Sequence, residues 1–233
     1  MKSPNRLTVP LEAGATTALV YPAQGQTIDR TLILAHGAGA GQQSPFMVSV
    51  ANALAALGAT VVTFNFLYTE QQRRIPDRAP ALEACYGAVI ALVRDRVAGA
   101  SGPLFIGGKS MGGRIATQVA AADASLAVDG LVLLGYPLHP PGRPEQLRDK
   151  HLPLVRRPML FLQGSRDAFG TPAELEPILC TLTPRPLLHV IAGGDHSFNV
   201  PGRNADTQNE VYAGIERQVV AWMRATGATA RVP

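Results

Sequence analysis

Short apolar runs recur along the chain, and they end in glycine, proline or asparagine. Six of them lie at 31–37, 60–66, 103–108, 130–137, 158–165 and 186–194. Their β-branched and aromatic residues are typical of strands that are buried on both faces of a parallel sheet. A further segment, 16–22, alternates more strongly between apolar and polar residues. We expect it to be an antiparallel strand at the edge of that sheet.

Between these strands, apolar residues repeat every three or four positions, as on one face of a helix. The repeats are Phe46, Val50, Leu54 and Leu57; Leu82, Cys85, Val89, Leu92 and Val97; and Val211, Ile215, Val219, Trp222 and Met223. Ser44-Pro45 and Thr171-Pro172 each have the signature of an N-cap followed by proline in the first helical turn. Alternating strands and helices predict a doubly wound α/β fold with a mostly parallel sheet of about seven or eight strands.

Neither a shift in composition nor an internal repeat divides the sequence, so we expect a single domain over residues 1–233. Hydrophobic residues make up 46% of the chain and charged residues 16%, which is enough to build a sizeable core and argues against disorder. Residues 1–14 and 226–233 lie outside the regular pattern and are expected to be peripheral or frayed. The most proline-rich stretch, 136–153, is expected to be a loop between two strands.

The net charge of +4 is spread along the chain. Proteins that bind nucleic acid usually concentrate basic residues in a patch, so we expect no nucleic-acid partner. The sequence has no apolar run of membrane-spanning or signal-peptide length, and we therefore expect a cytoplasmic protein without membrane contact. Cys85 and Cys180 fall in apolar helical patterns and are expected to be buried free thiols. We expect neither a metal nor a cofactor.

The segment FIGGKSMGGR, residues 105–114, contains two overlapping motifs. Gly-Lys-Ser could end a phosphate-binding P-loop, but that motif requires a glycine five positions before Gly108. Pro103 stands there instead, with no N–H and a fixed φ. The second motif, G-x-S-x-G, exposes a nucleophilic serine on a sharp turn between a strand and a helix. Because an apolar strand leads directly into it, the sequence favours Ser110 as a nucleophile.

A serine nucleophile needs a general base, and in this type of site the acid and the histidine follow the serine along the chain. His196, in AGGDHSF, follows a predicted strand and is the candidate base. Asp167 follows the strand at 158–165 and is the candidate acid. Asp195 is the alternative, but a residue next to His196 can hardly reach its Nδ1. We expect Asp195 to stabilise its own loop.

The negative charge that develops on the substrate oxygen during attack requires two hydrogen-bond donors. The N–H of Met111, directly after the nucleophile, is one candidate. The second is the N–H of Ala38, in the loop AHGAGAGQQSPF after the first central strand. A flexible glycine-rich connection is the alternative interpretation of this loop. His36 is expected to brace it rather than take part in the chemistry.

Taken together, these segments resemble the α/β-hydrolase superfamily from residue 16 to Trp222, with Ser110, Asp167 and His196 at the triad positions. The segments HGAGAG, GGKSMGGR, GYPLHPPGRPEQLRDKHL and GGDHSF are similar, more narrowly, to a branch of small dienelactone-hydrolase-like proteins. That branch includes bacterial predicted hydrolases and relatives of the KANSL-type chromatin scaffold subunit. Dienelactone hydrolases themselves use cysteine as the nucleophile, whereas this sequence has serine.

The resemblance implies the α/β-hydrolase fold without a large cap domain. Larger relatives carry that cap between the strands that correspond to 130–137 and 158–165, where this chain has only the proline-rich loop. Five side chains are candidates for the rim of the resulting open site, with ordinary loop packing an equal alternative for each: Tyr136, Leu138, His139, Phe169 and Phe198. Lys109 is expected to form a salt bridge, with attraction of anionic substrates as the alternative.

These expectations combine into a serine hydrolase that cleaves small carboxylic esters or thioesters through an acyl-enzyme. Its partner is then a small-molecule ester. A non-catalytic scaffold or binding protein on the same fold is one alternative. A peptidase or C–C bond hydrolase with the same triad is another.

Overall fold

The protein is built around one eight-stranded sheet, seen here in a computed structural model that describes residues 3–97, 100 and 102–226. The strand order is β1-β2-β4-β3-β5-β6-β7-β8. All strands from β3 to β8 run parallel, whereas β1 and β2 are antiparallel to their neighbours. The strand bounds are β1 Asn5–Leu11, β2 Gly14–Tyr21, β3 Thr31–Ala35, β4 Thr60–Phe64, β5 Leu104–Lys109, β6 Gly130–Leu134, β7 Met159–Gly164 and β8 Leu187–Ile191.

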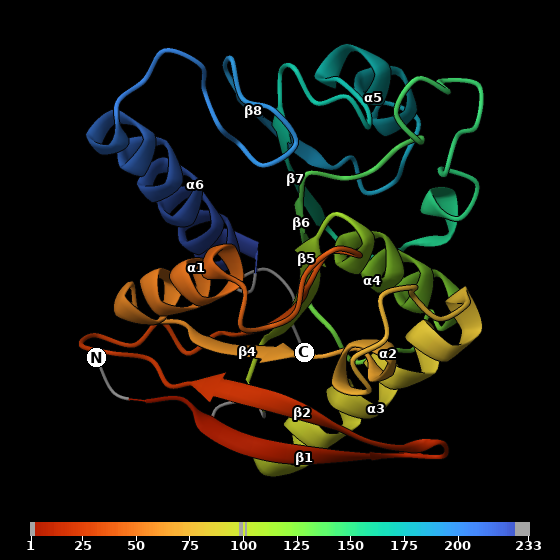
Figure 1. The fold of residues 1–233 in the computed structure, drawn as a ribbon, viewed down its shortest axis with the longest axis vertical. Coiled ribbons are helices and arrows are strands. Elements are labelled where there is room, and N and C mark those ends of the chain that lie inside the picture. Colours follow the sequence, from red (N-terminus) through yellow and green to blue (C-terminus); the bar gives the residue numbers. More distant parts are fainter. Residues whose placement is uncertain (1–2, 98–99, 101, 227–233) are drawn as a thin grey trace.

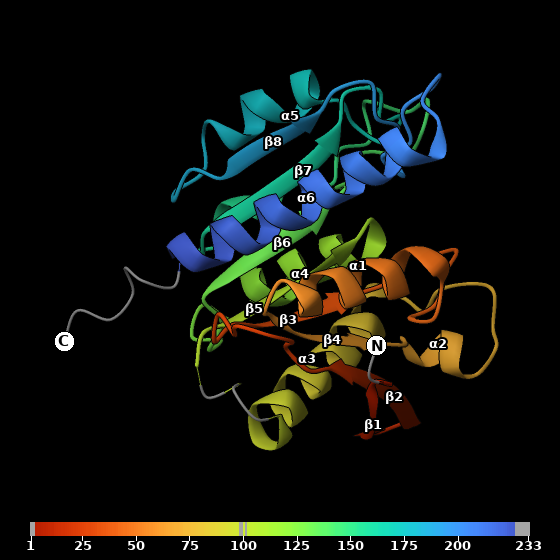
Figure 2. The ribbon, with the colours of Figure 1, turned by 90° about the vertical axis from the view of Figure 1, so that its left-hand side faces the viewer.

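Helices cover both faces of this sheet (Figures 1 and 2). On one face, α1 and α6 pack on the strands, and on the other face α3, α4 and α5 do so. The helix bounds are α1 Pro45–Ala56, α2 Leu67–Glu70, α3 Ala79–Arg96, α4 Met111–Ala122, α5 Pro172–Leu179 and α6 Ala205–Thr226. In β3, Leu32 and Leu34 belong to one core and Ile33 to the other. Burial on two faces explains why the sequence shows continuous apolar runs there.

The two expected N-cap residues, Ser44 and Thr171, each directly precede a helix. α1 begins at Pro45, directly after Ser44, and α5 begins at Pro172. At α5 the Glu174 carboxylate accepts hydrogen bonds from the backbone N–H and the hydroxyl of Thr171, at 2.8 and 2.7 Å. The reach of Glu174 back to the N-cap backbone is one half of a capping box.

The N-terminal region differs from the sequence-based expectation. The segment at 16–22 is not the edge strand, because β2 lies between β1 and β4. Residues 5–11 form the edge strand β1, so this part of 1–14 is peripheral but ordered. Val9 is fully buried, and Leu7 and Leu11 pack against the core on the same side, where β1 lies against α3. Residues 227–233, expected to be frayed, lie outside the described residues.

Only a short 3₁₀ turn, Leu152–Leu154, interrupts the connection from β6 to β7 at 135–158. This connection therefore carries no cap domain, as the resemblance implied. Of the two cysteines, Cys85 is buried and free, but the prediction for Cys180 is wrong. Cys180 is free and exposed because α5 ends at Leu179 and leaves it at the open end of the helix. None of the helices in the described part of the chain has the length and apolar character needed to cross a membrane.

Candidate active site

Ser110 occupies a sharp turn between β5 and α4. Its backbone has a φ of 51° and a ψ of −116°, a conformation that costs energy in any residue other than glycine. Gly108 and Gly112 explain how the turn fits against β3. A Cβ added to either residue would lie 2.4 Å from the carbonyl oxygen of Ala35. The two glycines of G-x-S-x-G are therefore required by close backbone contact, and the turn presents the Ser110 side chain beyond the end of the sheet.

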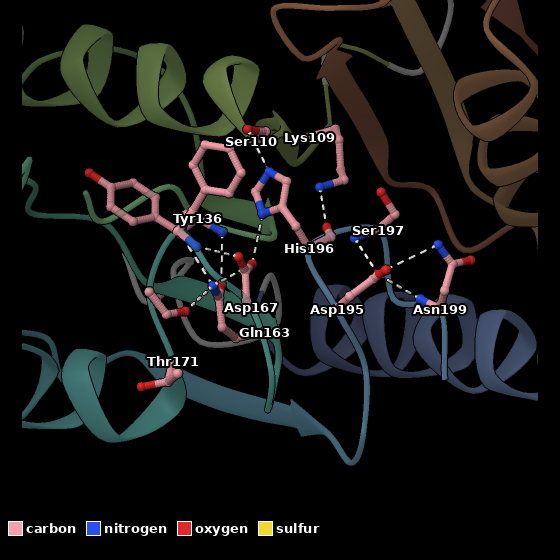
Figure 3. Close-up of polar contacts among 12 residues, drawn as sticks. Lys109, Ser110, Tyr136, Gln163, Asp167, Thr171, Asp195, His196, Ser197 and Asn199 are labelled. Carbon is pink, nitrogen blue, oxygen red and sulfur yellow. Dashed lines mark hydrogen bonds and ion pairs between the residues drawn. The ribbon is translucent and has the colours of Figure 1, made fainter. Parts of the chain in front are cut away.

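Three side chains from separate loops form a hydrogen-bonded series at this edge (Figure 3). His196, in the loop between β8 and α6, has its Nε2 2.8 Å from Ser110 Oγ. Its Nδ1 lies 2.7 Å from Oδ2 of Asp167, which follows β7. Because a carboxylate only accepts, this contact assigns the proton to Nδ1 and leaves Nε2 free to accept from the serine hydroxyl. The structure thus brings together all three residues that the sequence selected.

Asp167 is almost completely buried, and its two oxygens are held by groups besides His196. Its Oδ1 accepts a 2.8 Å hydrogen bond from the backbone N–H of Phe169. Its Oδ2 accepts a 2.9 Å bond from Nε2 of Gln163. These bonds orient the carboxylate and compensate in part for the loss of water around a buried charge.

Gln163 was not identified from the sequence. It is fully buried in β7, and its Oε1 accepts a 2.8 Å hydrogen bond from the backbone N–H of Tyr136. Its Nε2 also lies 2.7 Å from the carbonyl oxygen of Gly170. The amide therefore joins the end of β6 to the loop that carries Asp167. The available signal was one polar residue inside the apolar run MLFLQG, since a buried amide in such a strand needs partners.

Asp195 stabilises its own loop, as expected. Its Oδ1 accepts hydrogen bonds from the backbone N–H groups of Ser197 and Asn199, at 2.8 and 2.9 Å (Figure 3). These bonds join the side chain of the residue before His196 to the loop backbone after it.

The glycine-rich loop after β3 passes directly beside the nucleophile. A Cβ added to Gly37 would lie 3.6 Å from Ser110 Cβ, and the next residue, Ala38, is exposed. Met111 is the first residue of α4, where backbone N–H groups have no acceptor within the helix. A cavity of about 470 Å³ opens beside the loop, with Ala38, Tyr68 and Thr69 among its lining residues.

His36 braces this loop from beneath. Its Nδ1 lies 2.8 Å from the carbonyl oxygen of Gly37, and its Nε2 lies 3.2 Å from the backbone N–H of Phe66, from which it accepts. The Tyr68 hydroxyl donates to the carbonyl oxygen of Ala38 at 3.0 Å. His36 is fully buried, and this burial lowers its pKa, so the ring stays neutral while it supports the loop.

Four of the five candidate rim residues are buried, which favours loop packing, the alternative given for each of them: Tyr136, Leu138, His139 and Phe198. Tyr136 turns inward, where its hydroxyl donates to the carbonyl oxygen of Arg148 at 2.7 Å. Leu138 lies beneath Gly170, whose added Cβ would approach it to 2.7 Å. Phe169 alone remains half-exposed, and it stacks on the His196 ring with centroids 4.2 Å apart.

Lys109 does not form the predicted salt bridge. Within the described residues, no carboxylate oxygen lies within 4.0 Å of its Nζ. Nζ instead donates a hydrogen bond of 2.5 Å to the backbone carbonyl oxygen of His196. Burial lowers the pKa of Lys109 to about 8, while attraction to Asp167 and Asp195 opposes this effect.

Comparison with known families gives one match that spans most of the chain. A family model for the α/β hydrolase domain matches residues 28–224. This range extends from just before β3 to near the end of α6, and it includes every loop that contributes to the candidate site.

Solved structures with the same fold cover nearly all of the chain. An α/β serine hydrolase without a lid, from Xanthomonas campestris, has a TM-score of 0.75 at 22% identity, with 100% of this chain and 98% of that chain covered. A serine hydrolase homologue from Coxiella burnetii has a TM-score of 0.75 at 18% identity, covering 94% and 99%. A dienelactone hydrolase from Anabaena variabilis has a TM-score of 0.74 at 20% identity, covering 97% and 99%.

Proposed function

This chain belongs to the α/β hydrolase domain family, and we propose that it is a serine hydrolase of small carboxylic esters or thioesters. The observation that carries the proposal is the hydrogen-bonded series from Asp167 through His196 to Ser110, with distances of 2.7 and 2.8 Å. A serine hydroxyl becomes an effective nucleophile when a base accepts its proton during attack, and these contacts provide a path for that proton.

In the proposed mechanism, Ser110 Oγ attacks the carbonyl carbon of the ester while His196 Nε2 takes the hydroxyl proton. Asp167 remains ionised, holds the proton on Nδ1 and stabilises the imidazolium that forms. The N–H groups of Met111 and Ala38 donate to the oxyanion. His196 then gives its proton to the departing alcohol or thiol, which leaves an acyl-enzyme. Water attacks this acyl group with His196 again acting as base, and Ser110 is released.

The surroundings support a small substrate that enters from solvent. The connection between β6 and β7 adds no cap domain over the site. Ala38, one of the two proposed oxyanion donors, is among the residues that line the cavity of about 470 Å³, whereas the three triad residues are not. Phe169 stacks on the His196 ring and is still partly exposed, so it is the remaining candidate for a substrate contact from the predicted rim. A cytoplasmic location also remains part of the proposal.

The substitution Ser110→Ala tests this function. With p-nitrophenyl acetate and butyrate as substrates, we expect turnover to fall by about a thousandfold or more, the usual result when a triad nucleophile is removed. Ser49→Ala, at an exposed position on α1, is the matched control and should retain full activity.

Labelling with a fluorophosphonate separates this proposal from its alternatives. We expect the probe to modify Ser110 in the wild-type protein and to leave Ser110→Ala unmodified. A folded wild-type protein that neither labels nor hydrolyses the esters would favour the non-catalytic scaffold. Labelling without ester turnover would direct the search to peptide and C–C substrates.

A further inference from the structure

The side chain of Lys109 joins the nucleophile segment to the loop that carries the candidate base. Lys109 is the last residue of β5 and directly precedes Ser110. Its Nζ donates a 2.5 Å hydrogen bond to the backbone carbonyl oxygen of His196 (Figure 3). Ser110 and His196, between which the proposed proton transfer takes place, are thus held together by a second contact, from the Lys109 side chain to the His196 backbone. A movement of the His196 loop away from Ser110 would have to break this bond.

The neighbouring residues leave room for an ammonium group at this position. Gly135, directly after β6, has a φ of +66° and no side chain, and a Cβ added there would lie 2.9 Å from Nζ. On another side, the ring centroid of Phe198 is 5.4 Å from Nζ, a distance at which a cation and an aromatic face attract. The ammonium is therefore enclosed by the end of β6 and the His196 loop.

Several titratable groups face Lys109 from the surrounding elements. His196, Asp167 and Asp195 come from the loops after β7 and β8, and both carboxylates attract the ammonium. Burial lowers the pKa of Lys109 itself only to about 8, so most molecules carry the ammonium at pH 7.

We propose that Lys109 is a positioning residue that holds the His196 loop at Ser110. The inference rests on the proposed function, in which His196 is the general base. It assigns a role to the residue that makes the sequence resemble a P-loop.

The test measures how fast a fluorophosphonate labels Ser110 at pH 7 in the wild-type protein, in Lys109→Met and in Lys109→Gln. Methionine has a similar length but neither the charge nor the N–H donor. We expect the labelling rate of Lys109→Met to fall about tenfold or more, because the base is less well placed. Lys109→Gln keeps a neutral N–H donor and should recover part of the lost rate.

Lys150→Met, at an exposed position in the β6–β7 connection, controls for the loss of one positive charge from the chain and should leave the rate unchanged. If Lys109→Met fails to fold, Lys109→Leu provides the same comparison without a donor. A folded Lys109→Met with the wild-type rate overturns the proposal, and so does a folded Lys109→Gln that labels no faster than the variant without a donor. Absence of labelling in the wild-type protein refutes the serine-hydrolase proposal itself, and with it the role of His196.

Discussion

Glu216 places a carboxyl group between α6 and α1, where it should make the stability of the protein depend on pH. The residue is 9% exposed and lines a small cavity with Phe46 and Tyr212. In the described chain, no hydrogen bond or ion pair to its carboxylate is present. Burial raises the pKa of Glu216 from 4.5 to about 7, and the charge of Arg217 only partly opposes this.

The raised pKa means that the folded protein favours the protonated carboxyl more than the unfolded chain does. The resulting contribution to stability is fully present below about pH 4.5 and is lost as the pH rises through about 7. Each pH unit between these values corresponds to about 1.36 kcal/mol, so the free energy of unfolding should fall by up to about 3 kcal/mol. For a chain of this size, that is a change in Tm of about 6–12 °C.

Glu216→Gln tests this, because glutamine has nearly the same shape and stays neutral at every pH. Urea unfolding can be followed by the fluorescence of Trp222, the single tryptophan, which packs on Phe105 in the core. We expect the variant to be more stable than the wild-type protein by up to about 3 kcal/mol at pH 8.5 and similar to it at pH 4.5. Glu210→Gln, exposed on the same helix, is the control. A stability difference that does not change with pH would refute the reasoning.

Three further substitutions test the site and the packing of the fold. Asp167→Asn should keep the fold but lower ester turnover by about four orders of magnitude. The amide NH2 can donate to Nδ1 of His196, which places the imidazole proton on Nε2, where the base must accept. Activity within tenfold of the wild type would argue against Asp167 as the acid. Gly112→Ala should abolish folding or activity, because the new Cβ would lie 2.4 Å from the Ala35 carbonyl oxygen. Gly87→Ala lies inside α3, with no atom of the described residues within 4 Å of the new Cβ apart from its chain neighbours and the helix's own backbone. It should stabilise the protein by about 0.5–1 kcal/mol in the same urea assay. Equal effects of the two glycine substitutions would contradict the assigned contacts.

Much of the fold could be predicted because its signals are local. A strand buried on two faces needs a continuous apolar run, and each of the six predicted runs coincides with one of the parallel strands, although β5 extends one residue further, to Lys109. β1 was missed because its alternation in Leu7, Val9 and Leu11 is short and includes a proline. Its burial depends on α3, which lies about seventy positions further along the chain.

Ser110, Asp167 and His196 could be selected from the sequence for a related reason. The positive φ of Ser110 and the close contacts of Gly108 and Gly112 require the motif of five residues, G-x-S-x-G, which can be recognised in the sequence. Asp167 and His196 follow strands, and the carboxyl ends of parallel strands meet at one edge of a sheet. The sequence could not decide between loop packing and substrate contact at the rim, because burial of Tyr136, Leu138 and Phe198 depends on contacts with distant loops. Gln163 was missed for the same reason, since its partners follow from the pairing of β6 with β7.

The sequence by itself determined the order of strands and helices, the nucleophile turn and the chain order of serine, acid and histidine. Periodicity, turn geometry and the sheet-edge rule are enough for these features, because they act within a few residues or through a general property of parallel sheets. Only the tertiary structure decided the order of the strands within the sheet, the side chains that remain exposed at the site and the position of the Lys109 ammonium. Lys109 and His196 are 87 positions apart, so their contact exists only when the strands that carry them are packed into one sheet.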